Sequence, residues 1–77
     1  KTVSSAAEQR QFKKDLARLE RQIEKLKVRI TELVQEQIDS AFDPAELSRV
    51  TIELESQRVE LNSREEEWLE ITLLLEQ

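Results

Sequence analysis

Three consecutive glutamates, Glu65-Glu66-Glu67, form the densest group of chemically active side chains in this 77-residue sequence. Carboxylates can bind a metal ion or transfer protons only when their side chains converge on one point. Successive residues of a helix point in different directions, and no apolar residues surround these three to favour the neutral acid. We therefore interpret the run as solvent-exposed charge and expect no metal site there.

The composition excludes several classes of chemistry. Cys, His and Gly are absent and Pro occurs once, which excludes disulfides, thiolate or imidazole metal ligands, Cys- or His-based nucleophiles and phosphate-binding Gly-rich loops. The sequence has no apolar run of about 18 residues that could cross a membrane. We expect no catalytic residue, no cofactor, no metal, no membrane contact and no small-molecule substrate in this fragment, so an enzyme is the least favoured hypothesis.

Cations recur at the spacing of one helical face between residues 10 and 25. Their steps of four, four, three and four predict an outward stripe about 22 Å long, at a rise of about 1.5 Å per residue. Such a stripe is typical of a surface that contacts nucleic-acid phosphates without base specificity. The predicted nucleic-acid-binding residues are Arg10, Lys14, Arg18, Arg21 and Lys25.

An alternative interpretation of these cations is charge complementarity within the fold. The net charge is −5, and the second half of the chain is acidic. In an antiparallel fold the basic stretch 10–29 would lie beside the acidic region 60–70, where flanking charges set the orientation of the helices. The acidic half would also repel phosphates that approach from its side, and no aromatic platform accompanies the cations.

Two ladders of apolar residues predict the elements that carry these charges. Steps of three and four average to the repeat of a supercoiled helix, and both ladders share one heptad phase. The first consists of Phe12, Leu16, Leu19, Ile23, Leu26, Ile30 and Leu33, and the second of Leu47, Val50, Leu54, Leu61, Trp68, Ile71 and Leu75, with Gln57 and Arg64 at the two skipped positions. We predict an all-α fold, an antiparallel two-helix coiled-coil hairpin.

Capping signals place the predicted boundaries at helix 5–39, turn 40–43 and helix 44–76. Ser5 and Glu8 have the spacing of a capping box at the first helix. At the second helix Asp43 is the expected N-cap, Pro44 suits the first helical position, and Glu46 would close another box. Phe42 and Leu47 have the spacing of a hydrophobic staple.

Arms of equal length and a short connection favour folding back within one chain, so residues 1–77 form a single domain in this interpretation. Two chains could instead pair as a four-helix bundle or a swapped dimer. A core this small contributes little net stability, and the sequence lacks an initiating Met. We therefore expect a fragment of a larger polypeptide that is assisted by a partner.

Apolar residues outside the seam predict a second contact surface on the second helix. A helix that is apolar on two faces usually has two partners, although isolated exposed apolar residues are common. Docking to a parent domain and self-association as a homodimer explain these residues equally well. The predicted protein-interface residues are Ile52, Val59, Leu69, Leu73 and Leu74.

Four segments resemble a known family. They are the entry run Ser5-Ala6-Ala7-Glu8-Gln9-Arg10, the stretch Lys13-Lys14-Asp15-Leu16-Ala17-Arg18-Leu19-Glu20, the restart Asp43-Pro44, and Glu65-Glu66-Glu67-Trp68-Leu69-Glu70. Together they span most of the chain and resemble the C-terminal coiled-coil domain of ABC-F ATPases, tandem ATP-binding-cassette proteins that are not transporters. Glu8, Gln9, Arg10 and Trp68 match the family pattern, while Leu16 stands near a position where many relatives have Pro.

The resemblance implies a C-terminal hairpin that follows the second ATPase cassette of a cytoplasmic bacterial protein. ATP and Mg would then be bound by the cassettes, which this fragment lacks and which would be its partners in cis. The family acts on ribosomes in translation or on DNA. We therefore expect a non-catalytic module that binds DNA or ribosomal RNA, with a structural or oligomerising coiled coil as the alternative.

Overall fold

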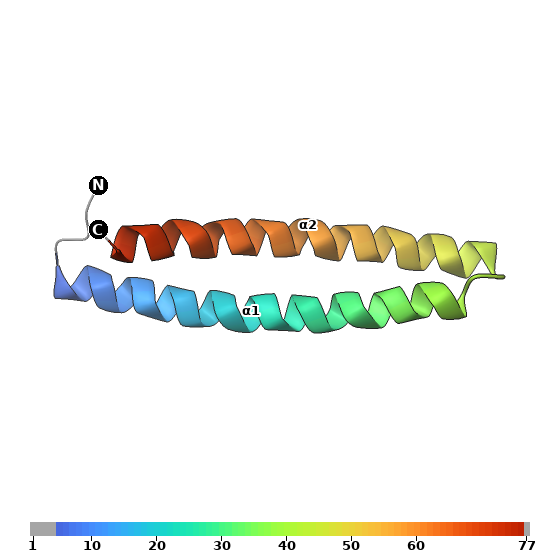
Figure 1. Ribbon diagram of the computed structural model, residues 1–77, viewed down its shortest axis with the longest axis horizontal. Coiled ribbons are helices and arrows are strands. Elements are labelled where there is room, and N and C mark those ends of the chain that lie inside the picture. The colour runs from blue at the N-terminus through green and yellow to red at the C-terminus, as the bar shows by residue number, and fades with distance from the viewer. Residues whose placement is uncertain (1–4, 77) are drawn as a thin grey trace.

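The computed structural model describes residues 5–76 and shows two long helices that lie side by side in opposite directions (Figure 1). Helix α1 spans Ala6–Asp39 and helix α2 spans Pro44–Leu75, with residues 40–43 between them. The molecule is a rod that measures 56 × 18 × 13 Å. The predicted antiparallel helical hairpin is confirmed, and within the described residues the helix ends lie within one residue of their predicted positions.

Side-chain oxygens cap both helix starts, as predicted. The Ser5 hydroxyl oxygen accepts the backbone N–H of Glu8 at 3.1 Å, and the Ser5 hydroxyl donates to the Glu8 carboxylate at 3.1 Å. At α2 the Asp43 carboxylate accepts the N–H of Glu46 at 3.3 Å. Each oxygen satisfies an amide that has no partner within its own helix, which explains why both helices begin where they do.

Two finer predictions at the start of α2 are wrong. Glu46 does not close a capping box, because the Asp43 N–H already donates to the Ser40 carbonyl at 2.9 Å and the Glu46 carboxylate bonds to Arg49 instead. Phe42 does not form a staple with Leu47. Its side chain is fully exposed, whereas Leu47 is half-buried among the seam residues.

The turn closes without glycine because it needs no left-handed residue. Ser40 ends α1 at φ −98° and ψ 11°, and its N–H donates to the Glu36 carbonyl at 2.9 Å. The N–H of Ala41 donates to the Ile38 carbonyl at 3.3 Å. No residue in the described part of the chain has a positive φ, so a sequence that lacks Gly forms this turn without strain.

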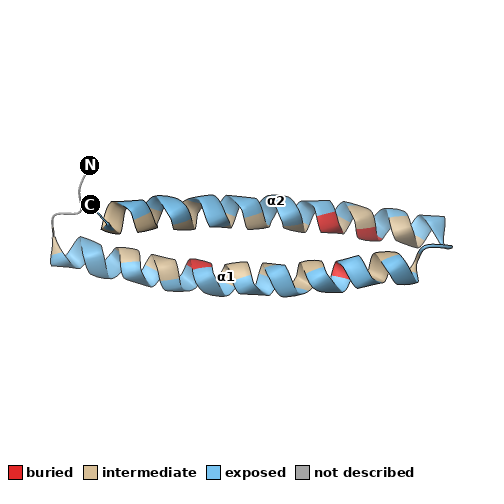
Figure 2. Ribbon diagram, in the orientation of Figure 1, coloured by how far each residue is buried: buried red, intermediate tan, exposed pale blue. Residues whose placement is uncertain are grey.

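The two apolar ladders form the contact between the helices. Every ladder residue is buried or half-buried, and so are Gln57 and Arg64 at the skipped positions. Four side chains, Leu19, Leu33, Val50 and Leu54, are at most 1% exposed (Figure 2). Leu33, Val50 and Leu54 form one cluster on which Ile30 packs. The best-packed part of the seam therefore lies toward the turn.

Two hydrogen bonds between side chains define the register of the helices. The Gln37 amide donates to the Thr51 hydroxyl at 3.0 Å, and the Trp68 indole N–H donates to the Glu20 carboxylate at 3.2 Å. The residue numbers add up to 88 in both pairs, so one register holds along most of the rod. The same sum places Gln57 level with Thr31 and Arg64 level with Glu24, so their nearest seam neighbours on α1 are Ile30 and Ile23, one residue away.

Candidate functional site

The five predicted cations, here called the basic stripe, are all exposed on α1. Heptad spacing explains the exposure, because these positions fall between the seam positions on the outward side of the helix. Arg18 lies 3.6 Å from the half-buried Asp15 carboxylate of the same helix, a long contact that contributes little because the guanidinium is exposed. Within residues 5–76 the other four cations make no ion pair. The stripe is Arg10, Lys14, Arg18, Arg21 and Lys25.

The ion pairs between the helices come from other residues. The Arg29 guanidinium lies 2.8 Å from the Glu53 carboxylate of α2 and 3.1 Å from that of Glu36. Arg49 of α2 lies 3.7 Å from the Glu36 carboxylate of α1. Within the described residues no ion pair joins the basic stretch 10–29 to the acidic region 60–70. The predicted complementarity therefore operates near the turn and through a different acid, Glu53.

These ion pairs shift the ionisation of the groups that form them. The hydrogen bond to Glu53 raises the pKa of Arg29, and the hydrogen bond to Glu46 raises the pKa of Arg49. The same contact with Arg49 lowers the pKa of the Glu46 carboxyl. All three shifts favour the charged forms, so these contacts are present at neutral pH.

Four of the five predicted interface residues are more than half exposed, and they form what we call the outer apolar face of α2. Their exposed fractions are 69% for Ile52, 71% for Val59, 52% for Leu69 and 52% for Leu73. The fifth, Leu74, is half-buried because its position flanks the seam. A depression of about 630 Å³ lies between Ile52 and Val59 on this face.

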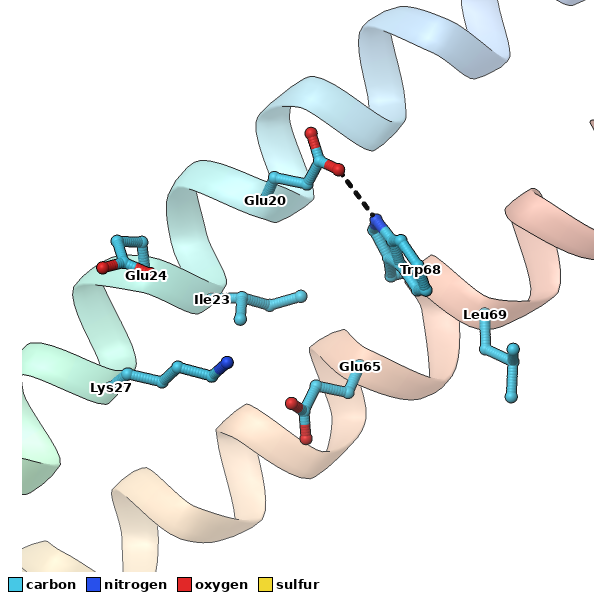
Figure 3. Close-up of a pocket in the computed structure, with 7 residues that line it drawn as sticks. All are labelled: Glu20, Ile23, Glu24, Lys27, Glu65, Trp68 and Leu69. Carbon is cyan, nitrogen blue, oxygen red and sulfur yellow. Dashed lines mark hydrogen bonds between the residues drawn. The ribbon is translucent and has the colours of Figure 1, made fainter.

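A groove between the helices, which we call the Trp68 groove, was not predicted from the sequence. It has a volume of about 600 Å³. The lining residues, drawn in Figure 3, are Glu20, Ile23, Glu24 and Lys27 of α1 and Glu65, Trp68 and Leu69 of α2. Figure 3 shows the Trp68 indole directed toward Glu20, to which it is hydrogen-bonded. The apolar ladders predicted that Ile23 and Trp68 face the seam. Which residues of the two helices meet to line the groove depends on the register, which the ladders do not determine.

Sequence reasoning also missed an exposed apolar row at the turn end of α1. Val34 is 37% exposed, Ile38 is 65% exposed and Phe42 is fully exposed. A spacing of four residues places the first two on neighbouring turns of one helical face, and Phe42 follows at the same interval in the turn. This spacing was visible in the sequence and could have identified the row.

The described residues contain no group of three or more acidic side chains placed to hold a metal ion. Neither described helix has a stretch apolar enough to traverse a bilayer. Comparisons with protein-family models, with curated proteins and with solved structures return no match for this chain. Within residues 5–76 the antiparallel helical hairpin therefore presents the basic stripe, the outer apolar face of α2, the Trp68 groove and the exposed apolar row at the turn.

Proposed function

We propose that this hairpin is a non-catalytic module that binds nucleic acid, either DNA or ribosomal RNA, through the basic stripe. The observation that supports the proposal is the exposure of all five cations on α1, four of which make no ion pair within residues 5–76. Cations that are free in this way can replace the counterions of a phosphate backbone. The stripe presents point charges and no aromatic platform, so it favours contact with phosphates rather than reading of bases.

The resemblance to the ABC-F family extends this proposal to the parent chain. In that proposal the parent is a cytoplasmic ATPase, its cassettes bind ATP and Mg, and the hairpin directs it to the ribosome or to DNA. The support is the Glu8-Gln9-Arg10 entry together with Trp68 in an acidic context. The natural coding sequence upstream of Lys1 tests whether the hairpin belongs to such an ATPase, because the proposal requires ATPase-cassette motifs before this residue.

A salt titration of binding to duplex DNA and to a ribosomal RNA fragment tests the role of the stripe. Each phosphate contact contributes a slope of about −0.9 to the plot of log affinity against log salt concentration for duplex DNA. The double variant Lys14→Gln/Arg21→Gln should weaken binding and make that slope shallower by about 2. Its matched control is Lys13→Gln/Arg58→Gln, which removes two exposed cations outside the stripe.

The control variant should keep a slope close to that of the unchanged protein, because its cations do not lie on the phosphate-facing side. Equal loss of slope in both double variants would indicate general charge attraction and refute a defined stripe. Unchanged affinity in the Lys14→Gln/Arg21→Gln variant would also refute the proposal. Circular dichroism of each variant confirms that the hairpin is still helical.

The outer apolar face supports a second candidate function, a structural coiled coil that docks protein or oligomerises. Four exposed apolar residues on one helix are the observation that favours it. Sedimentation across a range of concentrations should then detect self-association, and Leu73→Glu should abolish it. A monomer at every concentration, with no change in Leu73→Glu, would exclude a homodimer through this face.

A further inference from the structure

We propose that the Trp68 groove binds an arginine side chain presented by a protein partner. At about 600 Å³ its volume lies within the range of about 300–1,000 Å³ that is common for ligand sites. Its apolar lining comes from Ile23, Trp68 and Leu69, which belong to both helices. The site therefore exists only when the hairpin is folded in the register described above.

The charged residues of the groove favour a cationic occupant. Three carboxylates, those of Glu20, Glu24 and Glu65, line the groove with one cation, Lys27. Within residues 5–76 none of these four residues takes part in an ion pair, and the hydrogen bond recorded for Glu20 is to the Trp68 indole. An incoming cation would therefore meet three carboxylates that form no ion pair within residues 5–76 and that outnumber the one cation of the groove.

The aromatic ring favours arginine over other cations. A planar guanidinium stacks on an indole face and can donate two parallel hydrogen bonds to a carboxylate, which an ammonium cannot do. The indole N–H is held by Glu20, so the orientation of the ring is set before a ligand arrives. Phosphates would be repelled by the three carboxylates, so the groove and the basic stripe serve different partners.

Trp68 provides a direct readout, because the chain contains one Trp and no Tyr. The probe is a blocked Gly-Arg-Gly-Arg-Gly peptide, titrated into the full chain while the indole fluorescence is followed. A saturable change in intensity or wavelength is expected. The matched lysine peptide should bind about threefold more weakly, and the uncharged citrulline peptide should produce no saturable change.

Two charge-matched variants locate the binding. Glu24→Gln/Glu65→Gln should weaken binding of the arginine peptide by about fivefold. The control Glu66→Gln/Glu70→Gln removes two exposed carboxylates outside the groove and should change the affinity for the peptide by less than about twofold. If the first variant loses helicity, Glu24→Gln alone carries the test with an expected loss of about twofold. These results would support an arginine site in the groove.

Other results would overturn the proposal. Equal weakening in both double variants would show that the peptide responds to overall charge alone. A citrulline peptide that binds as well as the arginine peptide would show that the guanidinium is not recognised. A saturable change with a single-stranded oligonucleotide but none with the arginine peptide would assign the groove to a different class of ligand.

Discussion

Arg29 and Glu53 join the two helices through a double hydrogen bond across the seam. The Nε and Nη2 atoms of Arg29 donate to the same Glu53 oxygen at 3.1 and 2.8 Å. Leu33 and Leu54 belong to the buried cluster. Leu33 lies about one helical turn from Arg29, and Leu54 follows Glu53 in the sequence. This ion pair between the helices and the buried apolar cluster therefore lie in the same half of the hairpin, toward the turn.

Replacing Arg29 by Met should lower the melting temperature. Met retains much of the apolar stem but removes the guanidinium, so Glu36 and Glu53 keep Arg49 but lose the other cation that they share. The matched control is Arg58→Met, because Arg58 is exposed and makes no ion pair within residues 5–76. Thermal unfolding followed by circular dichroism measures both variants, and added salt should narrow the difference between them. Equal melting temperatures for the two variants would contradict a stabilising role for the Arg29 contacts.

The contact between Glu46 and Arg49 should make part of the stability depend on pH. Arg49 lowers the pKa of the Glu46 carboxyl below its ordinary value of 4.5, so folding favours the ionised form. The stabilisation is therefore complete well above pH 4.5 and is lost as the pH falls through the lowered pKa. The difference in melting temperature between the unchanged protein and Glu46→Gln should shrink over that range. A difference that stays constant from pH 7 to below the lowered pKa would contradict this linkage.

Leu33→Ala should remove most of the net stability. Leu33 is 0% exposed, and truncation of a buried leucine costs about 2–5 kcal/mol. A domain of this size has a net stability of only about 3–5 kcal/mol from its core. Leu73→Ala makes the same chemical change on the outer apolar face and should cost less than about 0.5 kcal/mol. Urea unfolding measures the free energy of unfolding of both variants. Equal decreases in the two variants would show that Leu33 is not part of the core.

The sequence predicted the hairpin but not its register, for a physical reason. Heptad spacing determines which face of each helix is apolar, and sliding one helix by seven residues leaves the same faces in contact. The register depends on pairwise contacts such as that between Gln37 and Thr51 and on how the turn closes. The wrong predictions at Phe42 and Glu46 have a similar cause. The spacing of residues does not show whether a backbone N–H already has another hydrogen-bond partner, as that of Asp43 does, or whether a side chain turns to solvent, as that of Phe42 does.

The candidate surfaces show the same difference between what heptad spacing predicts and what depends on the register. Exposure of the basic stripe and of most of the outer apolar face followed from the heptad positions of these residues, which lie on the side of each helix that faces away from the seam. Leu74 departs from that expectation because a position beside the seam is half-covered by the opposite helix. The Trp68 groove required both helices in one register, since Glu24 and Glu65 are far apart in the sequence and line it together.

The register itself predicts that Gln57→Leu should stabilise the hairpin. Gln57 is half-buried, and its nearest seam neighbour on α1 is Ile30, which packs on the cluster of Leu33, Val50 and Leu54. Leu at this position would extend the apolar cluster by one layer, whereas a polar seam residue lowers stability. We expect a gain of about 1 kcal/mol in the free energy of unfolding, measured with urea. The adjacent variant Ser56→Leu places the same side chain on the exposed surface and should give no such gain. A loss of stability in Gln57→Leu would show that position 57 does not face the seam at Ile30, which would refute the register.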